Sequence, residues 1–520
     1  MKRLIFNLLP AFLLSPCCFA QAQTNQPDTA VFNRIRRAEF NSSQIPQIAH
    51  YLTDVAGSRL TNSEGYRRAA EWAVATMKKW GLANAKTEPW GQFGKQWDLE
   101  SFTISMTAPY VTSLRAYPNP WSPNTKGLQK GQVVVISSQQ YLDSTYLEHH
   151  MQDFKSKFVL LTGKAPKPDG AFGPTATRLS DTALANLKDK YMEKRENVES
   201  EIAFTRKLVG LDMILKKAGA LGLIFSGSKS ANGTVFVQGY YGYKLTDPET
   251  LPQITIALED AQKIKRLYQS GHSVEITCQV KGQSSTRNTA GYNVIGEIPG
   301  IDAKLKSQLV MLGGHLDSWS AATGATDNAA GCIVMLEAMR LLDSLGLKPK
   351  RTIRLALWDG EEQGLFGSYN YVKNHFIDSK TYKLKPEQAK VSAYFNLDNG
   401  TGKIRGIHTQ NNTDVQPIFT SWFAPFSDLG AATVTPTNTG STDHLSFDWA
   451  GIPGFQFVQD EIDYETRTHH SNMDDYDHLQ MDDLKQAAVI VASFVYQASV
   501  RPELLPRKPL QKEPFVFEGL

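Results

Sequence analysis

Histidine and carboxylate side chains in the second half of the chain stand beside short apolar runs. His315 and Asp317 follow the run 309–313, and Asp327 lies in a loop of small residues that opens a predicted helix. Because alternate residues of an extended segment point the same way, His315 can face a site while Asp317 orients its ring. This spacing predicts a histidine ligand with its supporting acid, followed by a separate carboxylate ligand.

Three further groups follow apolar runs in the same way. They are Glu361-Glu362, Asp398 and the pair His469-His470. Adjacent carboxylates repel one another, and a bound cation is the most economical way to hold Glu361 and Glu362 together. Taken singly, each group also has a structural interpretation, such as a helix cap, an Asx turn or a surface loop.

Together the five groups supply two histidines, two aspartates and a glutamate as ligands, a donor set that suits zinc. Two zinc ions bring four positive charges, against the three negative charges of Asp327, Asp398 and Glu362. One glutamate is then free to act as a base. The pattern predicts a hydrolase with two metal ions.

The elements that must position these residues alternate between strands and helices from about residue 287 onward. The runs 309–313, 353–358 and 391–397 are predicted strands, and 332–345 is a predicted intervening helix. This alternation favours an α/β fold with a parallel sheet covered on both faces, in which ligands gather at the carboxyl ends of the strands.

The first half of the chain lacks this alternation of strands and helices. A helix is predicted over 63–80 with Gly81 as its stop, and the segment 97–278 is rich in short β-branched runs bounded by Pro, Gly and Asn. Within that segment, 188–207 is predicted to be a charged helical stretch, and 211–220 a second helix.

Composition and charge exclude several classes of protein. The chain has 520 residues, 41% hydrophobic and 21% charged, which is ordinary globular usage. A net charge of +3 gives no electrostatic reason to expect nucleic-acid binding. Only Cys278 and Cys332 lie beyond the leader described next, so the chain is not a disulfide scaffold.

The amino-terminal 22 residues have the layout of a secretory signal. Lys2 and Arg3 precede the apolar run 4–14, and small residues follow around Ala20 and Ala22. A buried first helix and a lipoprotein signal with its lipobox at residues 14–17 are the alternatives. No other segment is long enough to span a membrane, so we expect an exported protein, periplasmic or extracellular, with no transmembrane segment.

The spaced ligands strongly resemble those of the di-zinc exopeptidases, the family that holds the bacterial leucyl aminopeptidases and the glutamate carboxypeptidases. The residues that carry this resemblance are His315, Asp317, Asp327, Glu361, Glu362, Asp398 and His470. The segment 58–60 and the helix after it look like the amino-terminal segment of that family, and 217–224 resembles a protease-associated domain.

The resemblance implies a doubly wound, mixed but mostly parallel α/β sheet with a β-rich protease-associated insert. The subgroup that carries this insert includes secreted aminopeptidases and the plasma glutamate carboxypeptidase. In domain terms, the implied division is a signal peptide, two segments of a peptidase domain, the insert between them and a tail. Their expected bounds are 1–22 for the signal, 23–115 and 281–505 for the peptidase domain, 116–280 for the insert and 506–520 for the tail.

The same resemblance implies a role for each metal ligand. Asp327 would bridge two zinc ions. His315 and Asp398 would complete one site, and Glu362 and His470 would complete the other.

The remaining roles also come from the resemblance. Glu361 would be the general base, and Asp317 would support the first histidine. The second histidine of the pair 469–470 is preferred as ligand, since the family places an acid four residues later and Asp474 meets that spacing. His444 is a candidate substrate contact.

The implied function is that of a zinc exopeptidase acting on short peptides, an aminopeptidase or a dipeptidase. A carboxypeptidase is the near alternative, and a homodimer is left open. A glutaminyl cyclase of the same superfamily needs one zinc, and retention of both His315 and Asp398 counts against it. A binding or receptor-like protein on the same scaffold is the alternative of another class; such proteins lose metal ligands, whereas this chain keeps them.

Overall fold

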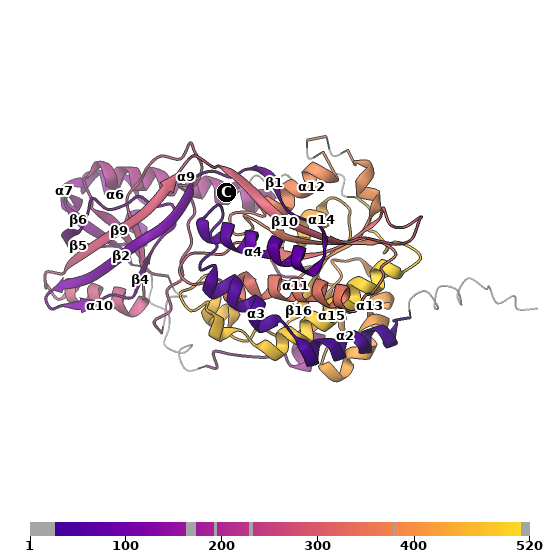
Figure 1. Cartoon of the computed structure of the whole chain (residues 1–520). Coiled ribbons are helices and arrows are strands. Elements are labelled where there is room, and N and C mark those ends of the chain that lie inside the picture. Colours follow the sequence, from indigo (N-terminus) through magenta and orange to yellow (C-terminus); the bar gives the residue numbers. More distant parts are fainter. Residues whose placement is uncertain are drawn as a thin grey trace, which may run out of the picture.

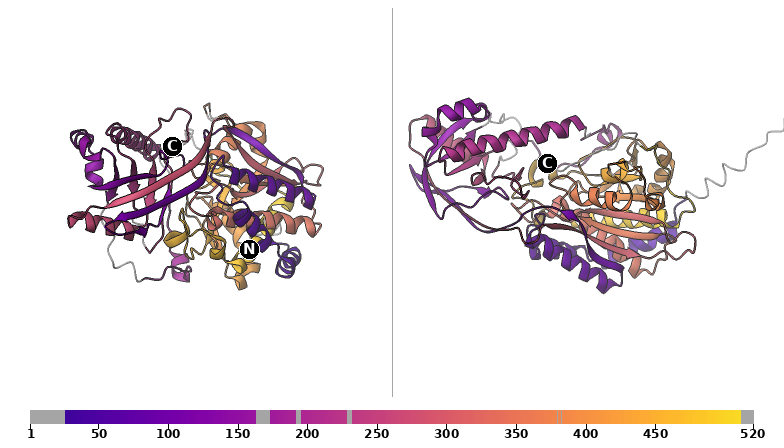
Figure 2. Two further views of the ribbon diagram at one scale, coloured as in Figure 1. Left: turned by 60° about the vertical axis from the view of Figure 1, so that its left-hand side comes forward. Right: turned by 90° about the horizontal axis from the view of Figure 1, so that it is seen from above.

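Two eight-stranded sheets organise the chain into two lobes that lie side by side (Figures 1 and 2). This computed structural model describes residues 26–162, 173–191, 195–227, 232–378, 380–381 and 383–510. The predicted signal peptide, 1–22, lies outside the described residues. Among the described residues, we find no helix that is both long enough and apolar enough to span a membrane.

The sheet of the larger lobe is mixed. Its strands, in spatial order, are β1 (Ala83–Gln92), β10 (Ala290–Ile298), β12 (Thr352–Trp358), β11 (Leu309–His315), β13 (Val391–Asn396), β16 (Gly454–Gln459), β14 (Ile404–His408) and β15 (Thr433–Thr435). Strands β12, β11, β13 and β16 run parallel, whereas β10 and β14 run antiparallel to β12 and β16. The strands predicted from the apolar runs are therefore the parallel centre of this sheet.

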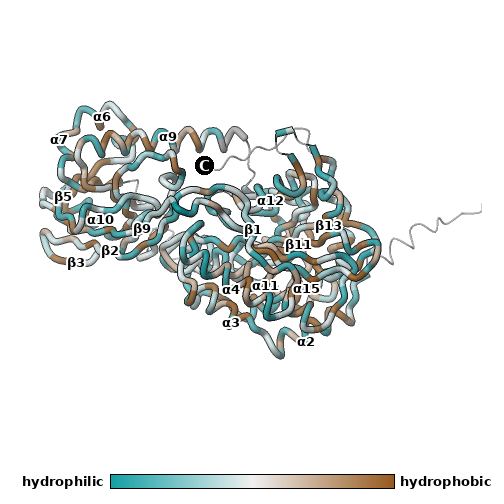
Figure 3. Tube along the Cα trace, turned by 45° about the horizontal axis from the view of Figure 1, so that its top comes forward, coloured by the Kyte–Doolittle hydropathy of each residue, from teal (hydrophilic) through white to brown (hydrophobic). Residues whose placement is uncertain are grey.

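Helices cover both faces of this sheet. They are α2 (Thr29–Ser42), α3 (Ile45–His50), α4 (Glu64–Trp80), α11 (Ala330–Ser344), α12 (Phe366–His375), α13 (Gln416–Phe423), α14 (His444–Trp449) and α15 (Met481–Val500). Along β11, Val310 and Leu312 pack in one core with α11 and α15, while Met311 packs in another with α12 and α14. This alternation follows from the two-residue period of a strand. Figure 3 shows the hydrophobic residues gathered on the inner elements.

Local signals in the sequence explain where the first long helix begins and ends. Helix α4 is capped by Ser63, whose side chain accepts a hydrogen bond from the main-chain nitrogen of Tyr66. Gly81 ends the helix in the left-handed region, with φ +90° and its N–H bonded to the carbonyls of the last turn. The helix predicted over 63–80 is confirmed.

The second lobe is built from the β-rich segment. Its strands, in spatial order, are β3 (Thr112–Ser113), β2 (Gln96–Ala108), β9 (Glu275–Ser285), β5 (Gln129–Ser137), β6 (Lys157–Thr162), β7 (Gly222–Phe225), β8 (Gln253–Ile256) and β4 (Ala116–Pro118). The long antiparallel strands β2 and β9 connect it to the larger lobe (Figure 1). This lobe begins before residue 116 and ends after residue 280, because both strands belong to its sheet.

The helices of the intervening segment are α5 (Ser138–Tyr141), α6 (Ser144–His149), α7 (Met151–Phe154), α8 (Asp181–Ala185), α9 (Arg195–Lys217) and α10 (Leu258–Gln269). The two helices predicted over 188–207 and 211–220 are wrong as separate elements. They form the single helix α9, which continues through Gly210, where a Cβ atom would meet no neighbouring atom within 4 Å. Residues 188–191 lie outside this helix.

The two cysteines of the described residues are unpaired. Cys278 lies in a core of the second lobe and Cys332 in the core of the larger lobe, and both are buried. Each is a small core residue rather than half of a disulfide bond.

Candidate metal centre

The carboxyl ends of the parallel strands bring the predicted ligands to one edge of the larger sheet. His315 is the last residue of β11, Glu361 and Glu362 follow β12, and Asp398 follows β13. The loop after β16 returns at residues 469–470. Because β11, β12, β13 and β16 run parallel, residues far apart in sequence meet at this edge.

A first group of ligand atoms surrounds His315. Its Nε2 lies 3.4 Å from Oδ1 of Asp327 and 3.3 Å from Oδ1 of Asp398. All three residues are buried or nearly so, and their ligand atoms lie within 4.8 Å of one another, close enough to share one metal ion. The carboxylate of Glu361 stands slightly farther away, with Oε2 at 3.9 Å from the same nitrogen.

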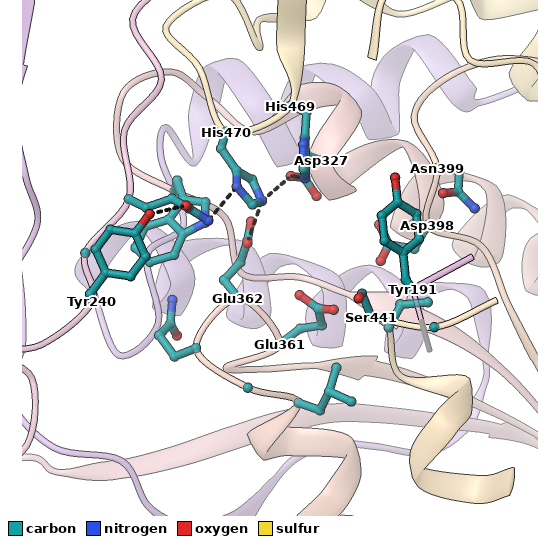
Figure 4. Close-up of a pocket in the computed structure, with 18 of the residues that line it drawn as sticks. Tyr191, Tyr240, Asp327, Glu361, Glu362, Asp398, Asn399, Ser441, His469 and His470 are labelled. Carbon is teal, nitrogen blue, oxygen red and sulfur yellow. Dashed lines mark hydrogen bonds and ion pairs between the residues drawn. The ribbon is translucent and has the colours of Figure 1, made fainter. Parts of the chain in front are cut away.

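A second group of ligand atoms shares Asp327 with the first. Nε2 of His470 lies 3.1 Å from Oδ2 of Asp327 and 2.9 Å from Oε2 of Glu362 (Figure 4). His469 is also near, but its Nε2 lies 3.9 Å from the same oxygen of Asp327. One oxygen of Asp327 thus faces each group.

The residues present fit a bound metal cation. Within the described part of the chain, no hydrogen bond reaches the buried Oε1 of Glu362, and the buried Oδ2 of Asp327 faces the ring nitrogens of His470 and His469. Burying carboxylate oxygens without a donor is costly unless a cation compensates them. Nitrogen and oxygen ligands of this kind are the donor set of catalytic zinc sites.

Burial and crowded charge displace the pKa values of these groups. The pKa of Glu362 is raised to about 7, chiefly by burial and then by the charge of Asp327. Burial lowers the pKa of His470, but the neighbouring carboxylates of Glu362 and Asp327 outweigh it and raise that pKa to about 10. Burial, followed by the charges of Asp398 and other nearby acids, raises the pKa of Glu361 well above its usual range. Without metal, this site therefore holds protons at neutral pH.

Asp317 supports the site through the main chain. Nδ1 of His315 lies 3.0 Å from the main-chain oxygen of Asp317 and 3.6 Å from its carboxylate Oδ1. The carboxylate itself accepts hydrogen bonds from the main-chain nitrogens of Glu361 and Glu362, at 3.2 and 3.3 Å, and from the Thr61 hydroxyl at 3.0 Å. Asp317 therefore holds both the first histidine and the loop of the two glutamates.

Two other buried residues hold the segment that carries Asp327. Asp474 accepts hydrogen bonds from the main-chain nitrogens of Thr326 and Asp327, at 2.6 and 3.1 Å. Arg59 is fully buried and donates to the main-chain oxygens of Leu316 at 2.7 Å and of Gly324 at 2.8 Å. The segment 58–60 thus braces the loop between the first histidine and the shared aspartate.

A cavity of about 570 Å³ opens over the candidate ligands. Its lining includes six carboxylates: Glu201, Asp327, Glu361, Glu362, Asp398 and Glu465. Among the described residues that line it there is no lysine and no arginine. Aromatic side chains supply much of the remaining wall: Tyr191, Tyr240, Tyr243, Trp319 and Tyr464.

His444 does not line this cavity, although Ser441 and Thr442 do. The His444 side chain is fully buried at the start of α14, and its Nε2 lies 3.0 Å from the main-chain oxygen of Thr439. Burial lowers the pKa of His444 to about 3, so the ring is neutral. In this structure His444 supports the loop that reaches the cavity.

Several lining residues that had no predicted role come from the segment between the two halves of the larger lobe. Gln238 and Tyr240 belong to the loop before β8, and Tyr191 lies in the segment 173–191, which contacts the larger lobe through the pairing of Thr177 with Ile462. No local pattern marks these residues, because their place at the site depends on how the two lobes meet.

The chain is similar in sequence to known peptidases. Residues 293–495 match the family model described as Peptidase family M28. Carboxypeptidase Q of Homo sapiens is 31% identical over 258 residues, which cover 49% of this chain and 52% of that protein. Aminopeptidase YwaD of Bacillus subtilis (strain 168) is 28% identical over 279 residues, which cover 52% and 57%. The chain spans about half the length of the curated relatives it matches.

Solved structures show the same fold. The crystal structure of a peptidase M28 precursor from Shewanella amazonensis SB2B covers 94% of this chain and 99% of its own, with a TM-score of 0.66 and 22% identity. The structure of BSAP, a zinc aminopeptidase from Bacillus subtilis, covers 88% and 95%, with a TM-score of 0.55 and 20% identity. The predicted α/β class with a mixed sheet is confirmed.

Proposed function

We propose, from the match of residues 293–495 to peptidase family M28, that this chain is a zinc exopeptidase that hydrolyses short peptides from their amino end. One observation carries the proposal. The buried groups around His315 and His470 adjoin through the single carboxylate of Asp327, and Glu361 lines the same cavity. This arrangement suits two metal ions and one free base.

Two zinc ions fit the ligands already described: His315 and Asp398 for one, Glu362 and His470 for the other, and Asp327 for both. When bound, zinc lowers the pKa of a coordinated water and polarises the scissile carbonyl. Glu361 accepts the proton that the attacking water loses. The same carboxyl group then donates that proton to the leaving amine, so Glu361 ends the cycle ionised.

The charge of the cavity favours an amino end over a carboxyl end. Three lining carboxylates are outside the proposed ligand set: Glu201, Glu361 and Glu465. They suit a substrate ammonium group, whereas the described lining offers no lysine or arginine for a substrate carboxylate. The volume of about 570 Å³ suits a short peptide rather than a folded protein.

We further propose that residues 1–22 direct export of the protein to the periplasm or the cell exterior. Residues 116–280 would form the body of a protease-associated insert between the two peptidase segments, 23–115 and 281–505, with 506–520 as a tail. Strand β2 and the end of β9, which lie within those two segments, complete the sheet of the insert. The separate second sheet and the aromatic residues that this segment adds to the cavity support a role for the insert in substrate access.

Hydrolysis of a matched set of dipeptides and tripeptides tests this function. Each peptide is offered free, blocked at the amino end or blocked at the carboxyl end, with chelator and with zinc add-back. We expect zinc-dependent cleavage that survives a carboxyl block and is lost with an amino block. The Glu361→Gln protein, purified identically, controls for a contaminating peptidase.

Cleavage that survives an amino block and is lost with a carboxyl block would identify a carboxypeptidase. No zinc-dependent cleavage of any peptide, in a protein that binds zinc, would overturn the exopeptidase proposal and favour a binding protein on this scaffold.

A further inference from the structure

A strand-like segment of the second lobe lies against the loop that carries His470. The main-chain nitrogen of Val235 donates to Oδ1 of Asn472 at 2.6 Å, and the main-chain nitrogen of Asn472 donates back to the oxygen of Val235 at 3.2 Å. Between these contacts, Phe236 and Ser471 form an antiparallel bridge. The pairing fixes the register between this segment and the histidine loop.

The same pairing holds an unfavourable backbone conformation at His470. This residue has φ +57°, in the left-handed region that non-glycine residues seldom occupy. The main-chain nitrogen of Val237 donates to the oxygen of His470 at 2.8 Å. The second lobe therefore stabilises the backbone that aims this histidine at Asp327 and Glu362.

The side chain of the next residue, Gln238, contacts the imidazole of His470 directly. Nε2 of Gln238 lies 2.7 Å from Nδ1 of His470, and the Tyr240 hydroxyl donates to Oε1 of Gln238 at 3.1 Å. The opposite ring nitrogen, Nε2, is the one that faces the carboxylates. Gln238 thus occupies the outer side of a candidate metal ligand.

A ligating histidine must be neutral, with its proton on the nitrogen that faces away from the metal. In the zinc-bound protein, Nδ1 of His470 therefore carries a proton and needs an acceptor. The amide of Gln238 can supply one, because reversing its oxygen and nitrogen keeps both contacts and exchanges donor for acceptor at each. The Tyr240 hydroxyl then accepts from the amide nitrogen.

From these contacts we propose that Gln238, supplied by the second lobe, is a positioning residue that fixes the tautomer and orientation of His470 for metal binding. The second lobe is then part of the metal centre as well as part of the cavity wall. This inference rests on the proposed function only in requiring that His470 is a zinc ligand.

Zinc binding to three variants tests the inference without relying on activity. Gln238→Leu removes the acceptor, and Gln238→Glu keeps one. Gln132→Leu is the matched control, since Gln132 lies exposed on β5 of the same lobe, where its side chain contacts only Ser273 among the described hydrogen bonds. Zinc stoichiometry and affinity are measured by chelator competition, and circular dichroism of the metal-free proteins checks the fold.

We expect Gln238→Leu to keep one zinc ion at parental affinity and to bind the other about 10–100-fold more weakly. Gln238→Glu and Gln132→Leu should bind both within a few-fold of the parent. Parental affinity for both ions in Gln238→Leu would overturn the inference, as would failure of Gln238→Glu to retain both. If Gln238→Leu does not fold, Gln238→Met, which also lacks an acceptor and matches glutamine in length, replaces it. A parent that binds no zinc would instead overturn the proposed function.

Discussion

Oδ1 of Asp317 accepts a hydrogen bond from the main-chain nitrogen of Glu361 at 3.2 Å. Asp317, which follows His315 closely in sequence, therefore holds the loop that carries the candidate base Glu361. Its second oxygen accepts from the next main-chain nitrogen, so each carboxylate oxygen holds one N–H group of this loop. An amide at this position can satisfy only one of the two donors.

We expect Asp317→Asn to lower kcat by about 10–100-fold while both zinc ions are retained. The amide nitrogen is a donor, so it would face one of the two main-chain N–H groups without accepting from it, and the loop of Glu361 would shift. The main-chain oxygen of residue 317 would still contact His315. Steady-state kinetics with zinc analysis of the same sample checks this. Loss of zinc in proportion to activity would show that the residue acts on the metal ligands instead.

The conversion Glu361→Gln separates the base from the ligands. We expect turnover to fall by about 10²–10⁴-fold with zinc content unchanged, because an amide cannot accept the proton of the attacking water. Glu362→Gln is the matched comparison and should weaken zinc binding at the group of His470. Normal turnover in Glu361→Gln would remove this residue from the mechanism.

The sequence predicted the parts of this site that depend on short segments. His315 and Asp398 each stand at the end of an apolar run, and such runs form the central parallel strands, so these residues could be grouped before any coordinates. Ser63 and Gly81 likewise mark the ends of α4 through local capping.

Short sequence patterns of this kind do not predict the contacts between the two lobes. Gln238 and His470 are 232 positions apart, and the contact depends on the packing of two sheets rather than on any local pattern. The sequence also did not predict the continuous helix α9, because its charged first part and more apolar second part look like two separate elements. Tertiary packing decides both features.

Asp327→Asn should affect both metal ions at once. Asp327 is the residue whose two oxygens face different groups, Oδ1 toward His315 and Oδ2 toward His470. We expect this variant to bind neither ion at concentrations that saturate the parent, whereas Asp398→Asn should lose one. Equal zinc content in the two variants would count against a shared carboxylate.

Zinc affinity should rise with pH. In the metal-free protein the pKa of His470 is raised to about 10 and that of Glu362 to about 7, so both groups hold protons that zinc must displace. Raising the pH removes those protons in advance and strengthens binding. Chelator competition between about pH 6 and pH 8, with an indicator of proton release, checks this. His478→Gln, which removes a histidine paired with Asp463 instead, should show the same slope.

Arg59 should be needed for both stability and metal affinity. Its guanidinium donates to the main-chain oxygens of Leu52 and Gly324 at 2.8 Å and of Leu316 at 2.7 Å. Arg59→Met would leave these buried oxygens unpaired, and we expect the free energy of unfolding to fall by about 2–5 kcal/mol.

Denaturant unfolding with excess chelator measures that loss apart from any effect of zinc. The control is Arg67→Met, which removes exposed ion pairs on α4 and should cost less than about 1 kcal/mol. Because two of the bonded oxygens, those of Leu316 and Gly324, lie in the segment between His315 and Asp327, the folded Arg59→Met protein should also bind zinc more weakly than the control. Parental zinc affinity would confine Arg59 to a role in stability.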